Sequence, residues 1–370
     1  MRLVLGVDAG GTSTRAAAFT VDGVEVGRGT AGGGNPGTLG LDRACANVSS
    51  AIASALAGAD SALVESVVLG LAGNPALADA LARRLFAASP ETGLPRALRP
   101  RLVRNVGDVV TAFCAGTPSP SGTVLISGTG AIAAKITGRA VVATSDGYGW
   151  LLGDDGSGFW LGRTAARAAL HALTEGRPSP LADLVTRRLL PAAPPHDPAP
   201  GPTLGPAPGP APGPAPGPAP GPAPGPALGP ALADRLVAAV HSRPPLALAE
   251  LAPLVSEAAA AGDPEAVAIA SEAAHLLAAT ALRVHDPGSP LVLAGSVLTS
   301  PGPIRDSVRA LLGTVHTAGD PAGAAAWLAA LPFLDPADAE KRHARFVAAL
   351  SHFTMSTEIE RSGFMAPLRW

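Results

Sequence analysis

The hydrophobic pattern at the start of the chain predicts a strand, a turn of small residues and a returning strand. Apolar residues run from Leu3 up to Asp8, a small-residue turn follows, and polar and apolar positions then alternate towards Thr20. A similar pattern recurs later, where an apolar strand ends at Ser127 and, after a Gly-Thr-Gly turn, a second strand begins near Ala131. The sequence therefore predicts two β-hairpins with glycine-rich turns.

The rest of the chain alternates between strand and helix periodicity. The first part predicts strands over 24–29, 64–70 and 101–106 and helices over 42–56, 75–87 and 109–115. The second part predicts strands over 124–127, 132–137, 141–144 and 291–294, and helices ending near 174, over 232–241, 246–261 and 264–283, and after Pro303. This order predicts an α/β fold with a largely parallel first sheet and functional loops at the carboxyl ends of its strands. Asp8, Gly73 and Asp108 fall at such ends.

The length of 370 residues is enough for two domains. A connector rich in Pro, Ser and Gly near 117–122 separates them, so we expect an N-terminal lobe over 1–117 and a C-terminal lobe over 118–345, followed by a tail over 346–370. The block 191–231 differs from both, because units of Gly-Pro-Ala-Pro/Leu repeat from Gly205 to Leu232. A period of four excludes collagen, which needs glycine at every third position. We expect a disordered insertion between two helices.

Composition narrows the function classes. A net charge of −2 with 15% charged residues gives no footprint for nucleic acid or an anionic membrane. Cys45 and Cys114 are the only cysteines, which argues against a disulfide framework, a Cys-rich zinc site or an iron–sulfur cluster held by this chain alone. The apolar stretch 267–284 carries charged residues and therefore predicts a core helix. The first strand begins at Leu3, which leaves no room for a signal peptide, so we expect a cytoplasmic protein.

The two glycine-rich turns are candidate phosphate loops. Their backbone N–H groups can approach an anion closely, because no bulky side chain stands in the way. The candidate phosphate-binding residues are Gly10, Gly11, Thr12 and Thr14 in the first loop and Gly128, Thr129 and Gly130 in the second. Asp8 is placed to hold a hydrated divalent cation beside the first loop. Two such loops facing each other would hold a nucleoside triphosphate; the alternative is two ordinary β-hairpins.

Other nucleotide and hydrolase signatures are missing. The sequence has no Gly-x-x-x-x-Gly-Lys-Ser/Thr motif, no His-Glu-x-x-His and no Gly-x-Ser-x-Gly. The stretch Gly128-Thr-Gly130-Ala-Ile-Ala133 mimics a dinucleotide-binding fingerprint, but that fingerprint must open a helix, whereas a strand pair is predicted here. The eight histidines show no metal-ligand spacing.

Four blocks, in order, carry a resemblance to a known family. They are the loop Asp8-Ala-Gly-Gly-Thr-Ser-Thr14, the acid Asp108 before a short helix, the loop Ser127-Gly-Thr-Gly130, and the block Gly147-Tyr-Gly-Trp-Leu-Leu-Gly-Asp154-Asp-Gly-Ser157; a fifth, weaker block is Ala294-Gly295-Ser296-Val297. The chain resembles the N-acetylglucosamine kinase family, in the BadF/BadG-type branch of the sugar kinase and actin-like ATPase (ribonuclease H-like) fold. The resemblance implies two lobes with a ligand cleft between them.

The resemblance also implies roles for individual residues. The enzyme would transfer the γ-phosphate of Mg-ATP to the 6-hydroxyl of N-acetyl-D-glucosamine, with Asp108 as the base that accepts the hydroxyl proton. From its position alone, Asp108 is also a candidate N-cap of the helix that follows. The sugar-binding residues implied are Asn35, Ala72, Gly73, Asp108, Gly147, Gly149 and Asp154, and the adenosine loop would contain Gly295 and Ser296. Trp160 is expected to fill the core.

Alternatives remain open. The family's usual Gly-Asp-Glu-Gly reads Gly153-Asp154-Asp155-Gly156 here, which leaves glucosamine, N-acetylmuramic acid or another hexose as substrates. A second class is an ATPase activator of acyl-CoA reductases or dehydratases, although neither cysteine has the setting of a cluster ligand. A third is a non-catalytic sugar-binding regulator, against which we set the lack of a DNA-binding segment before Leu3. A homodimer is compatible with the resemblance.

Overall fold

The fold is built on two mixed sheets with the same strand order. The computed structural model describes residues 1–87, 93–190 and 229–348. The first sheet has the order β3-β2-β1-β4-β5 and the second β10-β9-β6-β7-β8. The strands of the first are β1 (Leu3–Ala9), β2 (Ser13–Thr20), β3 (Glu25–Gly32), β4 (Val64–Leu71) and β5 (Leu102–Gly107). Those of the second are β6 (Gly122–Ser127), β7 (Ala131–Thr137), β8 (Ala140–Asp146), β9 (Leu291–Ala294) and β10 (His316–Thr317).

Strand directions repeat as well. In each sheet the central strand pairs antiparallel with the next strand and parallel with the first strand that follows a helix: β1 with β2 and β4, and β6 with β7 and β9. The predicted α/β class and both hairpins are therefore confirmed. The first sheet is mixed, because β1, β4 and β5 run parallel while β2 and β3 pair antiparallel with their neighbours.

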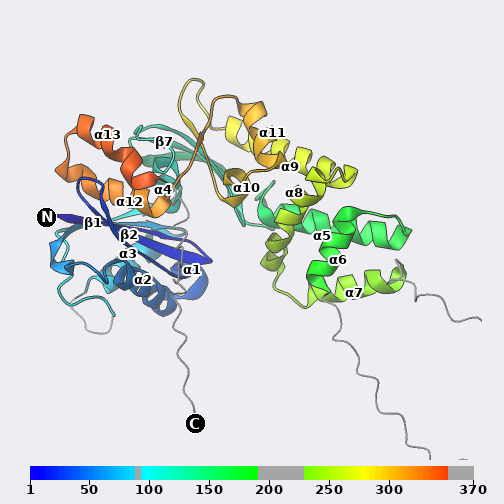
Figure 1. Cartoon of the computed structure of the whole chain (residues 1–370), viewed down its shortest axis with the longest axis horizontal. Coiled ribbons are helices and arrows are strands. Elements are labelled where there is room, and N and C mark those ends of the chain that lie inside the picture. The colour runs from blue at the N-terminus through cyan, green and yellow to red at the C-terminus, as the bar shows by residue number, and fades with distance from the viewer. Residues whose placement is uncertain (88–92, 191–228, 349–370) are drawn as a thin grey trace, which may run out of the picture.

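Helices cover both faces of the first sheet. On one face lie α2 (Leu41–Ala55) and α3 (Pro75–Leu85), with α1 (Pro36–Leu39) and a 3-10 turn, η1 (Ser61–Leu63), in the connections. On the other lie α4 (Asp108–Cys114) and α12 (Pro321–Ala330) (Figure 1). Successive side chains of β1 point to opposite faces of the sheet. Leu3, Leu5 and Val7 therefore pack in the core beneath α2 and α3, and Val4 packs in the core beneath α4 and α12.

The helix α12 corrects the predicted domain boundary. Residues 321–345 were predicted to belong to the second lobe, but α12 packs on β1, β2 and β4, and α13 (Pro336–Val347) packs on α12 (Figure 1). The approach to β1 is so close that a Cβ on Gly6 would lie 2.1 Å from the carbonyl oxygen of Ala322. A helix that is apolar on every side must be buried on every side. The helix α12 lies between the two sheets. The first lobe is therefore completed by residues that follow the second lobe in the sequence.

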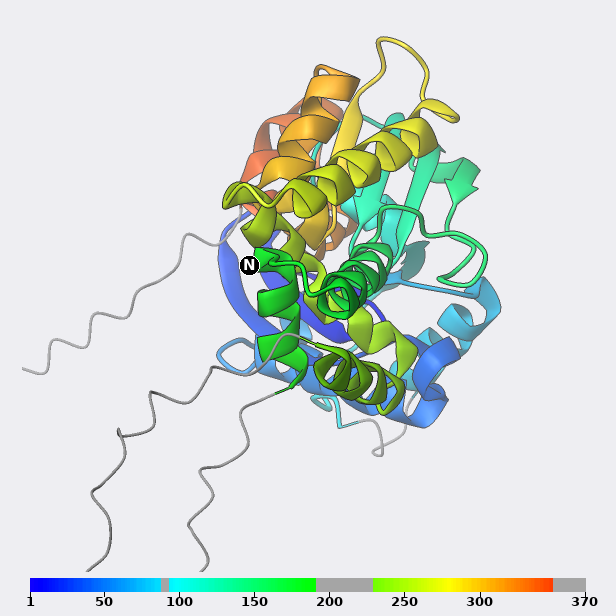
Figure 2. The same ribbon diagram turned by 90° about the vertical axis from the view of Figure 1, so that its right-hand side faces the viewer.

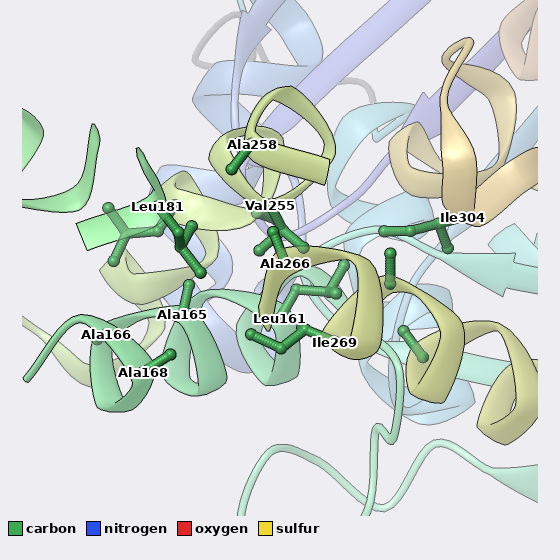
Figure 3. Packing of buried hydrophobic residues seen from close by; sticks show 14 of the residues in the cluster. Leu161, Ala165, Ala166, Ala168, Leu181, Val255, Ala258, Ala266, Ile269 and Ile304 are labelled. Carbon is green, nitrogen blue, oxygen red and sulfur yellow. The ribbon is translucent and has the colours of Figure 1, made fainter. Parts of the chain in front are cut away.

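The second lobe carries a helical layer on the outer face of its sheet. Its helices are α5 (Gly158–Glu175), α6 (Pro180–Leu189), α7 (Pro230–His241), α8 (Ala252–Ala260), α9 (Pro264–Leu282), α10 (Ser296–Thr299) and α11 (Pro303–Leu312) (Figure 1, Figure 2). Two short 3-10 helices are η3 (Pro245–Leu251) and η4 (Leu331–Phe333). Figure 3 shows Leu161 and Ala165 of α5 packed towards Val255 of α8 and Ile269 of α9.

Two predictions about these helices change. The helix predicted over 246–261 is divided into η3 and α8, with Pro253 in the first turn of α8. Proline has no N–H to donate, so it is tolerated at a helix start and interrupts a longer helix. The sequence pattern also missed α6, which begins after its N-cap Ser179.

The helix α9 is, by length and composition, the only described helix that could cross a membrane. Half of its apolar window is buried inside the protein, where it packs on α8 and α11. This agrees with the predicted core helix. The predicted insertion over 191–231 and the predicted tail over 346–370 fall largely outside the described residues, between Leu190 and Gly229 and beyond Ala348.

Candidate active site

The first glycine-rich turn joins β1 to β2 at the carboxyl end of β1. The N–H of Gly10 donates to the carbonyl of Ser13 (3.0 Å), and the carbonyl of Gly10 accepts from Gly34 and Asn35 (2.9 and 3.2 Å). Gly11 and Thr12 are exposed at the tip. Thr14 differs, because it is fully buried and its hydroxyl donates to the carbonyl of Gly32 (2.8 Å). Three of the four predicted residues therefore line the open turn, and Thr14 ties β2 to β3 beneath it.

Asp8 lies beside this turn, and its carboxylate is influenced by the negative charges of other acids. The Thr111 hydroxyl of α4 lies 3.3 Å from its Oδ1. Burial, together with the negative charges of Asp108 and Asp320, raises the pKa of Asp8 to about 7, against the opposing effect of Arg15. A divalent cation would relieve this repulsion, so the donor set fits Mg²⁺. No cluster of three or more metal-binding side chains occurs among the described residues, but Mg²⁺ commonly uses one or two carboxylates together with water and phosphate oxygens.

Asp108 stands at the first turn of α4. The helix begins at Asp108 and its N-cap is Gly107, so the alternative role of Asp108 as the N-cap is wrong by one residue. Its carboxylate accepts a hydrogen bond from the N–H of Val109 (2.9 Å), which fixes its direction. Burial raises the pKa of Asp108 above the usual range, although the hydrogen bond from Val109 works in the opposite sense. A partly desolvated carboxylate near the predicted phosphate loop can accept a proton.

Strand register explains why these acids meet. Ala9 is paired with Leu71, and Leu71 with Gly107, so β1, β4 and β5 end side by side. The residue before Ala9 and the residue after Gly107 are Asp8 and Asp108. Two acids a hundred residues apart are thus placed together by parallel pairing alone.

The predicted sugar-binding residues of the first lobe lie at the same edge. The N–H of Ala72 donates to the carbonyl of Ala9 (3.2 Å). Gly73 has a φ of 99°, and a Cβ there would lie 3.2 Å from Oδ1 of Asn35. Asn35 also accepts from the N–H of Gly37 (2.8 Å) as N-cap of α1. The amide of Asn35 and the turn at Gly73 therefore form one surface next to the first phosphate loop.

The second glycine-rich turn joins β6 to β7. The N–H of Gly128 donates to the carbonyl of Gly130 (2.9 Å), and its carbonyl accepts from Gly158 at the start of α5 (2.7 Å). Thr129 is exposed at the tip. Asp154 lies directly against this turn, since a Cβ on Gly130 would be 2.7 Å from its Oδ2. Burial raises the pKa of Asp154, with the backbone of Ala131 opposing this change.

The block around Asp154 is a tight loop. Gly147 and Gly149 have φ values of 81° and 83°, which only glycine adopts easily, and Asp154 itself has a φ of 60°. Tyr148 is largely exposed, whereas Trp150 packs on the ring of Phe159 (5.2 Å between centroids). Trp160 packs against the helical core, as predicted.

A cavity of about 310 Å³ adjoins the second turn. It is lined by Gly128 and Thr129, by Ser256 of α8, and by Ser296 and Arg305 beyond β9. This brings the predicted second phosphate loop and the predicted adenosine loop to one pocket. Within the described residues, no hydrogen bond or ion pair joins Asp154 to Asp8, Asp108 or Asn35, so the site consists of two groups of residues, one on each lobe.

Comparison with known proteins identifies the family. The family model described as the BadF/BadG/BcrA/BcrD ATPase family matches residues 5–311. The chain belongs to this ATPase family. The match covers the first sheet from Leu5 onward, β6 to β9 of the second sheet, both glycine-rich turns and the block around Asp154.

Individual relatives agree with this ATPase assignment. An N-acetyl-D-glucosamine kinase of Dictyostelium discoideum is 29% identical over 180 residues, which is 46% of this chain and 54% of that protein. The chain thus spans about half the length of this curated relative. A solved structure of a candidate N-acetylglucosamine kinase from Chromobacterium violaceum matches with a TM-score of 0.61 at 22% identity, covering 89% of this chain and 99% of that one. A similar candidate from Porphyromonas gingivalis matches with a TM-score of 0.57 at 19% identity, covering 93% and 99%. The predicted two-lobed fold is confirmed.

Three residues of the candidate site were not predicted from sequence. Thr111 contacts Asp8, Asp320 raises the pKa of Asp8 through its negative charge, and Asp146 organises the loop that carries Asp154. Asp320 is the N-cap of α12 and could not be linked to Asp8 until α12 was placed on the first sheet. A signal for Asp146 existed, because it directly precedes the Gly-x-Gly turn at Gly147.

Proposed function

We propose that the protein phosphorylates an amino sugar at its 6-hydroxyl with Mg-ATP, and that its substrate is N-acetyl-D-glucosamine. The observation that carries the proposal is the edge where β1, β4 and β5 end together. It places Asp8 and Asp108 beside a glycine-rich turn and next to the amide of Asn35. Phosphoryl transfer to a sugar requires a phosphate cradle, a cation site, a proton acceptor and hydrogen-bonding groups for the acceptor.

Each residue then has a defined task. The N–H groups at the tips of the two turns, Gly11 and Thr12 in the first and Thr129 and Gly130 in the second, bind phosphate oxygens, and the cavity at Ser296 receives the nucleoside. Asp8 holds Mg²⁺, which supplies neutralising charge at the phosphates. Asp108 accepts the proton of the sugar hydroxyl, and its raised pKa strengthens it as a base. Asp154 accepts hydrogen bonds from other sugar hydroxyls.

The choice of sugar rests on the Dictyostelium relative, which is named for N-acetyl-D-glucosamine. The shorter acid at Asp155 keeps glucosamine, N-acetylmuramic acid and other hexoses as competing substrates. We also propose that the two lobes close on the bound sugar, because the site residues are divided between them. Homodimerisation and a cytoplasmic location remain predictions.

The structure argues against the activator class. Cys45 and Cys114 are both free and buried, and burial raises the pKa of the Cys114 thiol to about 12. A cluster shared between subunits needs ionised thiolates at the surface. Neither cysteine offers one.

The test is ADP release from Mg-ATP with each of four sugars: N-acetyl-D-glucosamine, glucosamine, N-acetylmuramic acid and glucose. We expect the first to give the highest kcat/KM and Asp108→Asn to lower kcat by about 10²- to 10⁴-fold with little change in the KM for ATP. Asp60→Asn serves as the control, because Asp60 caps a short 3-10 turn outside the site.

Two results would contradict the proposal. ATP hydrolysis that is indifferent to every sugar would move the protein to the regulator or activator classes. Sugar-dependent turnover that Asp108→Asn leaves unchanged would remove Asp108 as the base.

A further inference from the structure

Asp146 is a buried carboxylate to which the proposed mechanism gives no task. It is 8% exposed and ends β8 with a φ of 65°. Its Oδ1 accepts from the N–H groups of Gly147 and Asp154, each at 2.7 Å, and its Oδ2 accepts from Asp155 at 3.0 Å. One side chain therefore closes the loop 146–155 by binding its first and last peptide groups.

Neighbouring groups restrict the carboxylate of Asp146 to a single position. Asp146 is paired with Ile132 in the β7–β8 ladder, which fixes its backbone. A Cβ on Gly153 would lie 2.1 Å from Oδ1 of Asp146, so the loop can fold over the carboxylate only with glycine there. Because the N–H of Asp154 is one of the bound groups, Asp146 sets where the side chain of Asp154 begins.

The loop is also fastened to the second glycine-rich turn. The Ser127 hydroxyl donates to the carbonyl of Gly156 (3.1 Å). The N–H groups of Gly158 and Phe159 donate to the carbonyls of that turn, at 2.7 and 3.2 Å, and Asp154 lies against Gly130. The loop 146–157 and the turn 127–130 are therefore one hydrogen-bonded unit.

We propose that Asp146 is a positioning residue that holds Asp154 against the second phosphate loop, so that bound hexosamine and bound nucleotide stabilise each other. The inference rests on the proposed function, since it takes Asp154 as a sugar contact and Gly128–Gly130 as a phosphate contact. A sugar that orders the loop also orders the turn, and thermodynamic reciprocity requires the converse.

Residue 146 must carry a carboxylate, because both of its side-chain oxygens accept hydrogen bonds from the loop. Asparagine offers one acceptor and turns an NH₂ group towards the remaining N–H, which leaves a buried donor unpaired. We therefore expect Asp146→Asn to release Asp155 and loosen Asp154. Gly153→Ala perturbs the same carboxylate from the opposite side without removing it.

Binding of ADP is measured by calorimetry with and without N-acetyl-D-glucosamine, together with kcat and both KM values. In the unmodified protein we expect the sugar to tighten ADP binding. In Asp146→Asn and Gly153→Ala we expect this coupling to disappear and the KM for sugar to rise about 10- to 100-fold, as for a displaced binding group.

The matched control is Asp263→Asn. Asp263 is likewise buried and accepts from Ser179 and Leu181 (3.0 Å each), but it caps α9 in the helical layer. We expect it to lower the melting temperature while leaving the coupling and both KM values unchanged. A structural effect is thereby separated from positioning.

Hydrogen exchange on the unmodified protein keeps the inference testable if the variants do not fold. Mg-ADP alone should increase protection of the amides of Gly147, Asp154 and Asp155. Unchanged protection, or an unchanged coupling in a folded Asp146→Asn kinase, overturns the inference and leaves the proposed function standing. A wild-type protein that binds no sugar overturns both.

Discussion

Gly295 and Gly288 share a backbone φ of 82° but differ in what surrounds them. Nothing lies within 4 Å of a Cβ placed on Gly288, whereas a Cβ on Gly295 would lie 2.3 Å from the carbonyl oxygen of Ser127. Ser127 is the last residue of β6, immediately before the second glycine-rich turn. At the residue scale, Gly295 therefore serves two purposes: it turns the chain after β9 and lets that turn pass against β6.

The pair of glycines provides a prediction with its own control. Gly288→Ala should cost about 1 kcal/mol of unfolding free energy, from backbone strain alone. Gly295→Ala should cost about 3 kcal/mol or more, because a steric clash adds to the strain, and it should also weaken nucleotide binding. Urea unfolding and ADP titration of both variants measure these effects. Equal losses in the two variants would mean that the contact with Ser127 is unimportant.

At the element scale, α13 contacts the end of α4, where the chain leaves the first lobe for the second. Nε2 of His343 donates to the carbonyl of Cys114 at the end of α4 (2.6 Å), and the imidazole lies edge-on to Trp327 of α12 (4.8 Å). Burial lowers the pKa of His343, against the opposing hydrogen bond to Cys114, and the charge of Arg139 lowers it further. The folded protein therefore holds this imidazole in its neutral form.

This neutral histidine predicts a pH dependence. Below the usual histidine pKa of about 6.5, the unfolded chain binds a proton at His343 more readily than the folded chain does. The contribution of His343 to the free energy of unfolding is therefore full above that pH and falls as the pH drops. His343→Phe keeps a ring but removes the donor, and should cost about 1–3 kcal/mol at pH 7.5. The difference from wild type should narrow towards pH 5.

Urea unfolding at pH 5, 6 and 7.5 measures this difference. His275→Gln, on an exposed position of α9, is the control and should leave the pH dependence unchanged. A stability difference between wild type and His343→Phe that stays constant across the range would show that another group is responsible.

At the scale of the whole molecule, the two sheets repeat one design with different additions. Both have a hairpin, a glycine-rich turn and parallel strands in the same order. The second sheet adds the layer of α5 to α9, and the chain between α6 and α7 carries the Gly-Pro-Ala repeats (Figure 2). Both ends of that segment, Leu190 and Gly229, belong to this helical layer.

The repeats should therefore be dispensable for catalysis. Replacing 191–228 by a short Gly/Ser linker should leave kcat and both KM values within about twofold, because loop closure depends weakly on length and both neighbouring helices pack on α5. The same linker inserted after Leu152, inside the loop that Asp146 closes, is the contrasting variant and should raise the KM for sugar. Loss of activity in the first variant would give the repeats a role in the enzyme.

The sequence predicted best where the signal was local. The strands of both hairpins, the glycine-rich turns and most helix positions follow from periodicity and turn residues over short stretches, and nearly all of these elements are found. The helix α12 was not predicted, because a helix without a polar face shows no amphipathic periodicity, and its residues were assigned to the second lobe. Asp320 was missed for the same reason.

The sequence by itself determined most strands and the longer amphipathic helices, the two candidate phosphate loops and the acids at strand ends, because these depend on residues close together in the chain. Only the tertiary structure decided that Asp8 and Asp108 share an edge, that Thr14 is buried under its loop, and that Asp146 holds Asp154 against Gly130. Register, burial and the resulting pKa values depend on partners far apart in sequence. Periodicity does not encode those partners, and folding brings them together.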